Sequence, residues 1–459
     1  MVVCNATYAE AVLITSGVHL YGGFGCPDSP MPWEYQLGSR ARVEPNVPGA
    51  ALEVRGTAAP VSVDDIEFVA ANAKPGRSSV AAWLVNSPAV TLRRCKFVAG
   101  AGGNGADGVD GDAGLDADVP AASLSGVAGQ CDARASINPG KAWVGPSACG
   151  SRGGDGGTAL LASGGLGGGN GEPTAHVAGA QANGGLPAPN GVLQGYSGGS
   201  GGDGETGSPG SPVAGAGSFG ESGYAAPVSG AGSQGFPGQG GGGGGASTTE
   251  SFPGCVGASG GVGGLGGCGG QGGGGGSAGS ASIALLSWNS GPVLERCELM
   301  AANGGAGGRG GNGGPGGLGR LGTPGGASSS WESANGAILL ARGGDGGRGG
   351  DGGMGGPGAG GNGGPSYALA FDGLTPRCIN TTLKAGTGGL GGLGGEGGTM
   401  RGPSGQRRSD PACITPTSLS RLSRAALRGI SFCSCNAARY RPAPATAESM
   451  GDTRARKTR

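Results

Sequence analysis

Glycine occupies every third position of residues 304–325 without a break, and often the second position of each triplet as well. Glycine loses more backbone entropy on ordering than any other residue, and it has no side chain to bury. Such a segment therefore builds neither an ordinary helix nor a hydrophobic core. A period of three fits the threefold polyproline II helix, in which one edge stays bare and another segment can approach closely.

The composition favours packing through the backbone. The chain has 117 glycines among 459 residues, whereas glycine is about 7% of an average protein. Charged residues are 13%, and the 30 Lys and Arg balance the 30 Asp and Glu. Disordered chains usually combine low hydrophobicity with high charge. Because apolar residues cluster in a few short runs, we expect one modest core with large glycine-rich additions.

Four segments form a repeat when they are aligned on their last residue, at 63–70, 92–99, 294–301 and 378–385. Each has an apolar first residue, then Ile, Cys or Thr fourth, Phe or Leu sixth, and Ala eighth. A proline precedes each unit. Short apolar runs at 80–85, 283–286 and 367–371 precede three of them. Strand–corner–strand units that recur in this way predict an all-β fold, a small parallel β-solenoid.

Residues 6–14 and 17–24 carry a recognisable pattern of Thr-Tyr-x-Glu-x-Val-x-Ile followed by Gly-Val-x-Leu-x-Gly. This pattern resembles the first coils of secreted bacterial proteins of the right-handed parallel β-helix (pectate-lyase-like) superfamily. The resemblance covers residues 1–100 well, 281–301 and 366–385 in part, and nothing else. It implies the fold and says little about activity.

Three of the four repeat units run almost at once into glycine triplets, which begin at Gly102, Gly304 and Gly388. Stacked units would therefore release three insertions at one corner, so that the insertions start side by side. Three states are open for the triplets: ordered polyglycine II packing, disorder, or a collagen triple helix, which needs more proline. The triplets resemble the polyglycine II bundles of phage adhesin tips and some antifreeze proteins, and the Gly-Gly-x repeats of mycobacterial PGRS-type surface proteins.

These patterns divide the chain into nine segments. We expect N-terminal β-helix coils at 1–101, a glycine-rich insertion region at 102–280, a rung at 281–303, a triplet insertion at 304–336, a short strand at 337–342, a triplet insertion at 343–365, a rung at 366–387, a glycine-rich segment at 388–405 and a basic low-complexity tail, expected to be disordered, at 406–459.

Twelve widely spaced cysteines favour disulfides and an oxidising compartment, with buried free thiols as the alternative. No signal peptide and no run of about 20 apolar residues is visible. We therefore expect an extracellular or cell-surface protein whose true start lies upstream, or a gene fragment. The tail is either a surface-binding segment with a short amphipathic helix at 417–429 or, as we favour, a terminus unrelated to the fold.

Two groups of residues are candidates for chemistry. Asp64 and Asp65 align with Arg93 and Arg94, and then with Glu295 and Arg296 in the next unit. Stacked acids and arginines are able to abstract protons in enzymes that cleave acidic polysaccharides, but they more often neutralise an exposed ladder of charge. Residues 102–110 fit a calcium-binding nonapeptide, yet such sites need tandem copies, and only an imperfect one follows at 111–119.

We therefore assign no catalytic, cofactor-binding or metal residue, and no cofactor. The leading hypothesis is a non-enzymatic secreted or cell-surface protein with a structural or adhesive role. A β-helix lyase or hydrolase of acidic polysaccharides is the alternative, and binding of ice or crystal surfaces is the third hypothesis. Expected partners are a second copy of the chain or a surface polysaccharide. Nucleic acid, a membrane span and a small-molecule cofactor are not expected.

Overall fold

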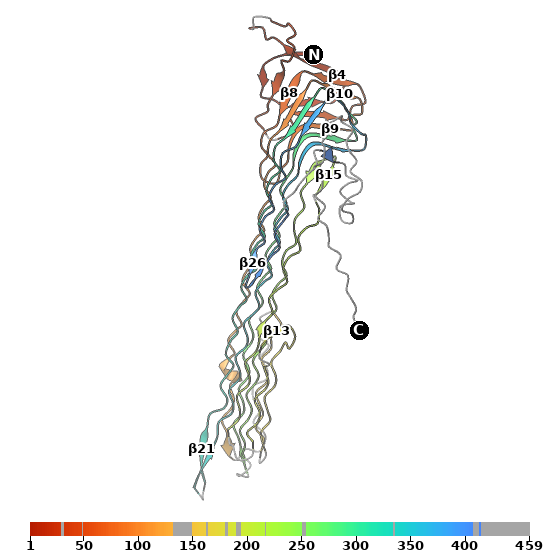
Figure 1. The fold of residues 1–459 in the computed structure, drawn as a ribbon. Coiled ribbons are helices and arrows are strands. Elements are labelled where there is room, and N and C mark those ends of the chain that lie inside the picture. The colour runs from red at the N-terminus through yellow and green to blue at the C-terminus, as the bar shows by residue number, and fades with distance from the viewer. Residues whose placement is uncertain are drawn as a thin grey trace, which may run out of the picture.

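The computed structural model of the protein has an all-β solenoid at one end, from which a long bundle of extended glycine-rich segments projects (Figure 1). It describes the chain to residue 406, together with the backbone of Cys413 and Ile414. Gaps in this description fall at 29–31, 48, 132–148, 162–163, 180–181, 190–193, 216, 250–253 and 334–335. The helix predicted at 417–429, and most of the tail predicted at 406–459, lie outside the described residues.

Three parallel sheets of six strands each form the solenoid. Sheet A consists of β1 (Val2–Cys4), β4 (Val18–Phe24), β7 (Val61–Asp64), β10 (Val90–Arg93), β19 (Val293–Glu295) and β24 (Arg377–Ile379). Sheet B consists of β2 (Thr7–Tyr8), β5 (Ala41–Val43), β8 (Ile66–Val69), β11 (Lys96–Ala99), β20 (Glu298–Ala301) and β25 (Thr382–Lys384). Sheet C consists of β3 (Val12–Ile14), β6 (Leu52–Arg55), β9 (Ser79–Val85), β18 (Ser282–Trp288), β23 (Ser366–Asp372) and β28 (Cys413–Ile414).

The strand register confirms the predicted repeat. Leu92 pairs with Val63 on one side and with Leu294 on the other, and Leu294 pairs in turn with Cys378. In most strands of sheets A and B, alternate residues point inward and are buried, as the period of a half-buried strand requires. In sheet C, β9, β18 and β23 are buried at nearly every residue, and a second apolar cluster includes Val80, Ile283 and Tyr367. Phe68 and Phe97 stack in consecutive coils with ring centroids 5.5 Å apart. The sixth position of the repeat therefore fills the centre of the core.

A residue in the left-handed region turns the chain from sheet A to sheet B in each of four coils. Asp65, Arg94, Arg296 and Asn380 have φ values of 54°, 53°, 52° and 49°. A side chain in this conformation costs roughly 1 kcal/mol or more, so its recurrence at one place marks a fixed corner of the solenoid. The third residue of the aligned repeat is therefore a corner residue and not a strand residue.

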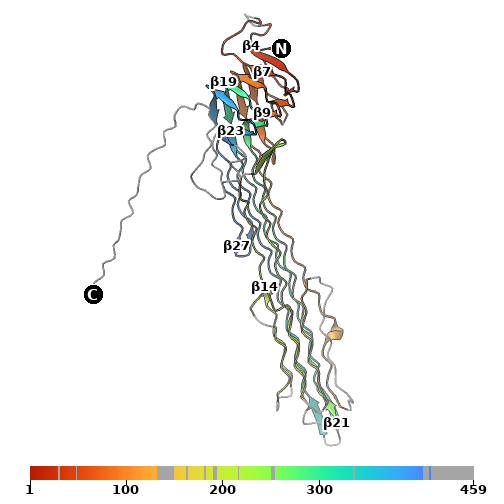
Figure 2. The same ribbon diagram turned by 90° about the vertical axis from the view of Figure 1, so that its right-hand side faces the viewer.

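The three insertions leave the solenoid at one corner, as predicted. The N–H of Gly102 donates to the carbonyl of Asn303 at 2.9 Å, and the N–H of Gly304 donates to that of Thr387 at 3.0 Å. The segments that follow β11, β20 and β25 are thus hydrogen-bonded neighbours from their first residues. They run together along the bundle, as both views show (Figures 1 and 2).

Backbone hydrogen bonds between different segments hold the bundle together, and they recur every third residue. Gly270, for example, donates to the carbonyl of Gly353 and accepts from the N–H of Gly235, which lie on two different neighbouring segments. Neighbours run in both directions, unlike the three parallel chains of collagen. Of the three predicted alternatives, the described triplets therefore adopt the ordered, polyglycine II-like one.

In several segments of the bundle, the number of glycines per triplet rises with the number of sides that neighbouring segments cover. The run 240–245 is all glycine and entirely buried. The segment that begins at Gly304 has two glycines in most of its triplets, and its third residues reach the surface in several of them. The segment that begins at Gly105 lies on the outside and keeps one glycine per triplet, since two of its three sides are open. A threefold helix has three sides, and a side that a neighbouring backbone covers closely has no room for a side chain. The relation is not strict, because Val262 and Leu265 are fully buried side chains within the bundle.

Short antiparallel pairs occur along the bundle. They are β12 (Gln130–Cys131) with β17 (Cys255–Val256), β13 (Val177–Ala178) with β14 (Asp203–Gly204), β15 (Ser218–Gly220) with β16 (Gly223–Ala225), β21 (Ser329–Ser333) with β22 (Gly336–Leu340), and β26 (Glu396–Gly397) with β27 (Met400–Arg401); η1 (Ala122–Leu124) is a short 3-10 helix. The strand expected at 337–342 is β22. It forms a hairpin with β21 at the end of the bundle far from the solenoid (Figure 1).

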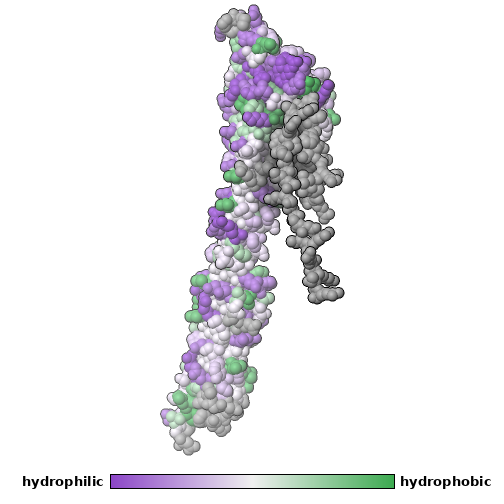
Figure 3. Space-filling view, in the orientation of Figure 1, coloured by the Kyte–Doolittle hydropathy of each residue, from purple (hydrophilic) through white to green (hydrophobic). Residues whose placement is uncertain are grey.

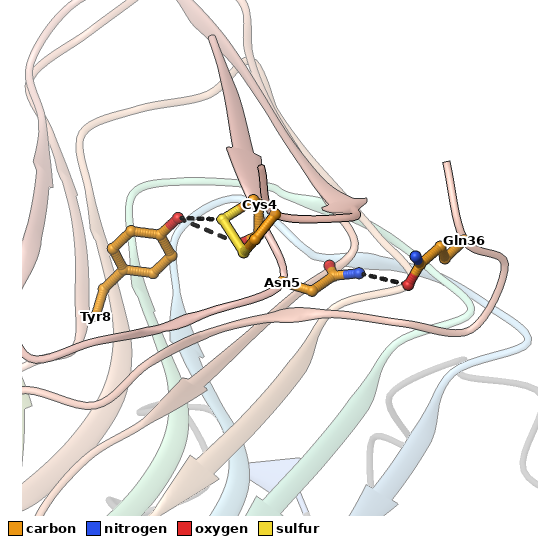
Figure 4. Close-up of a disulfide and its surroundings, with 5 residues drawn as sticks. Cys4, Asn5, Tyr8 and Gln36 are labelled. Atoms are coloured by element: carbon orange, nitrogen blue, oxygen red, sulfur yellow. Dashed lines mark hydrogen bonds between the residues drawn. A yellow bond between two sulfur atoms is a disulfide. The ribbon is translucent and has the colours of Figure 1, made fainter. Parts of the chain in front are cut away.

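Disulfides form as the cysteine count predicted. Cys4 pairs with Cys26, Cys131 with Cys255, and Cys149 with Cys268. At the first of these, the hydroxyl of Tyr8 donates to the carbonyl of Cys4, while Asn5 donates to Gln36 close by (Figure 4). In the described part of the chain, Cys95 and Cys297 are buried free thiols that occupy the fourth repeat position in consecutive coils. Burial raises the pKa of the Cys95 thiol, which makes it unreactive.

Candidate functional surfaces

The aligned acids and arginines meet on the outer side of the solenoid corner. Arg93 Nε donates to Asp64 Oδ1 at 2.5 Å, and Arg93 Nη2 donates to Asp64 Oδ2 at 3.1 Å. Arg94 makes the same two-pronged contact with Asp65, at 2.8 and 2.7 Å. The stacking of Asp64 on Arg93 and of Asp65 on Arg94 is therefore as predicted. Glu295 follows in the next coil, in register with Arg93.

Both carboxylates are covered by their arginines. Asp64 and Asp65 are 1% and 3% exposed, whereas the Arg93 and Arg94 side chains are about a third exposed. The hydrogen bonds that Arg94 donates to Asp65 raise the pKa of the Arg94 guanidinium further above its usual value. A general base must reach the proton that it abstracts. Since every oxygen of these carboxylates already accepts a hydrogen bond, the arrangement serves charge pairing better than proton transfer.

Replacing Asp65 by asparagine is expected to destabilise the solenoid by about 1–2 kcal/mol, because the change removes a buried charge partner from a guanidinium that water reaches only in part. The midpoint of urea unfolding measures this loss. Asp112→Asn, at an exposed aspartate of the bundle, is the matched control and should leave the midpoint unchanged. Equal midpoints for wild type and Asp65→Asn would contradict this role for the pair.

The predicted calcium nonapeptide has another use in the fold. Asp107, Asp110 and Asp116 direct Oδ1 to the backbone N–H groups of Arg309, Asn312 and Leu318, at 2.7, 2.6 and 2.8 Å. Each carboxylate thus supplies the acceptor that a surface N–H of the neighbouring segment lacks. Throughout the residues that the structure describes, no cluster of three or more His, Cys, Asp or Glu is placed to hold a metal ion.

One interruption in this row supports the same reading. Between Asp110 and Asp116 the equivalent position is Ala113, which has no acceptor. Its neighbour on the adjacent segment is Pro315, which has no N–H to donate. The acceptor is absent where the donor is absent. The period-three acidic residues were visible in the sequence, but their role was missed because the partner segment, 202 residues away, was unknown.

Replacing Asp110 by alanine should leave the N–H of Asn312 without its side-chain acceptor. We expect amide exchange at Asn312 to accelerate by about fivefold, since an exposed hydrogen bond contributes roughly 1 kcal/mol. Site-resolved hydrogen exchange measures this rate. Asp112→Ala removes a neighbouring carboxylate with no such partner and should not change exchange at Asn312. The same acceleration in both variants would contradict the capping role.

The surface of the bundle carries polar and apolar side chains in short alternating patches (Figure 3). Exposed leucines and valines stand at triplet positions, among them Val109, Leu115, Leu318, Leu390 and Leu393. A shallow groove of about 490 Å³ lies beside the Cys149–Cys268 disulfide and Phe236, and no charged side chain lines it. This groove does not resemble the deep, mostly apolar cleft that small-molecule ligands usually occupy.

No protein-family model, no curated protein and no solved structure matches this chain. In the described part of the chain, no helix has the length and apolar character needed to cross a membrane.

Proposed function

We propose that this chain is a non-enzymatic protein of the cell surface or the extracellular space, with a structural or adhesive role. The solenoid, which we assign to the right-handed parallel β-helix superfamily, would serve as the base from which a stiff glycine bundle projects. The observation that carries the proposal is the interior of the bundle, where run 240–245 consists of buried glycines hydrogen-bonded to their neighbours. Such an interior fixes the backbone and leaves no space for a reaction.

The outer segments hold side chains in regular rows, and this supports an adhesive role. Residues three apart in a threefold helix lie on one side, about 9 Å from each other. Leu390 and Leu393 form such a row and are 59% and 58% exposed. Repeated weak contacts along a stiff rod add up to strong overall binding. The partners that we propose are a surface polysaccharide or a second copy of the chain.

Three further features bear on the choice among the three hypotheses. The disulfides favour an oxidising compartment outside the cell. The carboxylates on which a lyase or hydrolase would depend, Asp64 and Asp65, already accept hydrogen bonds from arginines. Ice binding would need long rows of similar small side chains, whereas the row that starts at Ala306 continues with arginine, asparagine and proline.

The test uses the oxidised full chain. Co-sedimentation with insoluble polysaccharides and analytical ultracentrifugation should detect adhesion or self-association, while acidic polysaccharides should yield no unsaturated or reducing-end product. The double change Leu390→Ser and Leu393→Ser should weaken the association. Leu13→Ser, at an exposed leucine of the solenoid, is the control and should not. Release of product, or association that neither variant changes, would count against the proposal.

A further inference from the structure

The groove beside the Cys149–Cys268 disulfide is built from three segments of the bundle. Cys268 lies on the middle segment, and the two neighbouring segments contribute Leu115 and Phe236. Backbone hydrogen bonds join the middle segment to both neighbours, as where the N–H of Cys268 donates to the carbonyl of Leu115 at 2.9 Å. The disulfide adds a covalent link to a further part of the chain. A groove with walls fixed in this way loses little freedom when a ligand binds.

An aromatic ring and an exposed leucine form the apolar part of the groove. The His176 ring stacks on Phe236 with ring centroids 4.1 Å apart, and Glu205 lies 3.2 Å from His176 Nδ1. This stack holds the Phe236 ring in place while the ring lines the groove. Leu115, which also lines the groove, is 68% exposed. Such a surface suits a flat ligand that presents C–H groups on one side.

Two glutamine side chains keep hydrogen-bonding groups free at the groove. In the described part of the chain, the exposed amide of Gln271 has no hydrogen-bond partner. Gln234 Nε2 donates to the carbonyl of Gly269 at 3.3 Å, but within the same described residues its Oε1 accepts nothing. Gln239, by contrast, is 2% exposed and uses both ends of its amide on backbone groups. The groove therefore offers amide donors and acceptors to a ligand.

The groove also interrupts a row of charge. None of the described residues that line it is acidic or basic. The row that contains Asp110 and Asp116 has Ala113 between them, and Ala113 is the member of the row that lines the groove. An anionic ligand would need cationic side chains for complementarity. The lining therefore favours a ligand without charge.

The backbone around the groove is already paired. The N–H of Gly235 donates to the carbonyl of Gly270, whose own N–H donates to that of Gly353. The N–H of Gln271 donates to the carbonyl of Asp112. Bound peptides commonly gain affinity by pairing their backbone with an open strand edge. This groove offers side chains instead, which suits a ligand whose donors and acceptors are hydroxyl groups.

We infer that the groove binds a neutral polysaccharide, whose sugar rings pack on Phe236 and Leu115 and whose hydroxyl groups bond with Gln234 and Gln271. Sugar rings combine a C–H face with hydroxyl groups at the rim, and this matches the apolar and amide parts of the lining. A groove that is shallow accepts a long chain lying across it, without the need to thread a chain end. The inference rests on the proposed adhesive function and assigns its polysaccharide partner to one site and one charge class.

Co-sedimentation of the oxidised full chain tests the site. The probes are insoluble β-glucan, insoluble starch and chitin, with polygalacturonate and alginate gels as acidic counterparts. The chain should bind at least one neutral probe more tightly than the acidic ones, and Phe236→Leu with Gln271→Ala should raise that Kd at least about tenfold. Tyr196→Leu with Gln130→Ala, at an exposed ring and an exposed amide outside the groove, is the matched control and should leave the Kd unchanged. Equal urea midpoints show that both double variants remain folded.

Side-chain amide signals provide a second readout, in the unmodified chain. With glutamine labelled by ¹⁵N, a soluble neutral oligosaccharide of the type that binds should shift the signals of Gln234 and Gln271 and leave that of the buried Gln239 in place. A short proline-rich peptide is the competing probe. Shifts caused by the peptide and by no oligosaccharide would overturn the inference, and so would oligosaccharide binding that moves neither groove signal.

The outcomes separate this inference from the proposed function. Association that Leu390→Ser with Leu393→Ser weakens, and that Phe236→Leu with Gln271→Ala leaves unchanged, would overturn the groove assignment while the adhesive function stands. Tighter binding to the acidic gels than to every neutral probe would do the same. If the chain bound no polysaccharide and did not self-associate, both the inference and the proposed function would be wrong.

Discussion

Replacing Gly243 by alanine is expected to destabilise the glycine bundle by about 3 kcal/mol or more. A methyl carbon at this position would lie 1.9 Å from the carbonyl oxygen of Asp155, a backbone atom that no side-chain rotation can move away. The segments must then separate. Gly243 donates to the carbonyl of Gly169 and accepts from the N–H of Gly185, so separation also breaks hydrogen bonds to two neighbours. Urea unfolding and amide exchange across run 240–245 measure the loss.

A second glycine provides the control for the Gly243 experiment. Gly220, in the β15–β16 hairpin, has no atom within 4 Å of the place where a methyl carbon would stand, and its φ is not positive. Gly220→Ala should therefore change stability by less than about 0.5 kcal/mol. If Gly243→Ala had an equally small effect, the bundle interior would have to be looser than the close backbone contacts indicate.

The sequence predicted the solenoid because its repeat contains information about register. Val63, Leu92 and Leu294 hold the same place in segments with distinct corner and end residues, so only one alignment brings all positions together. The ion pairs of Asp64 with Arg93 and of Asp65 with Arg94 followed directly from that alignment. Residues far apart in the chain were thus placed together by sequence alone.

The bundle was less predictable for a physical reason. Successive glycine triplets are nearly identical, so a shift of one segment by one triplet preserves most of its contacts. No single segment therefore identifies which other segments are its neighbours. Only exceptions carry that information, such as Pro315 opposite Ala113 and the aspartates that flank this pair. The hairpin of β21 and β22 was missed because a strand pattern does not identify its partner. The even count of cysteines predicted disulfides, but not which cysteines pair.

Removal of the Cys131–Cys255 disulfide is expected to destabilise the bundle by about 4 kcal/mol. This bridge joins β12 to β17 and closes a sequence separation of 124 residues, and the Cys149–Cys268 bridge closes an overlapping one of 119. With one bridge intact, only about 30 residues of chain connect Cys131 to Cys255 through it, so the second bridge restricts a much shorter loop of the unfolded chain.

This overlap predicts that the two bridges do not contribute independently. Cys131→Ala with Cys255→Ala should cost about 4 kcal/mol, and the equivalent change at Cys149 and Cys268 a similar amount, but removing both bridges should cost about 1 kcal/mol more than the sum. The last bridge to be removed is the one that closes a long loop by itself. Urea unfolding of the wild type and the three variants measures the four stabilities. If the two single-bridge losses added up to the loss from removing both bridges, or to more, the bridges would not act through the unfolded chain. Their contribution would then come from local contacts of β12 and β17.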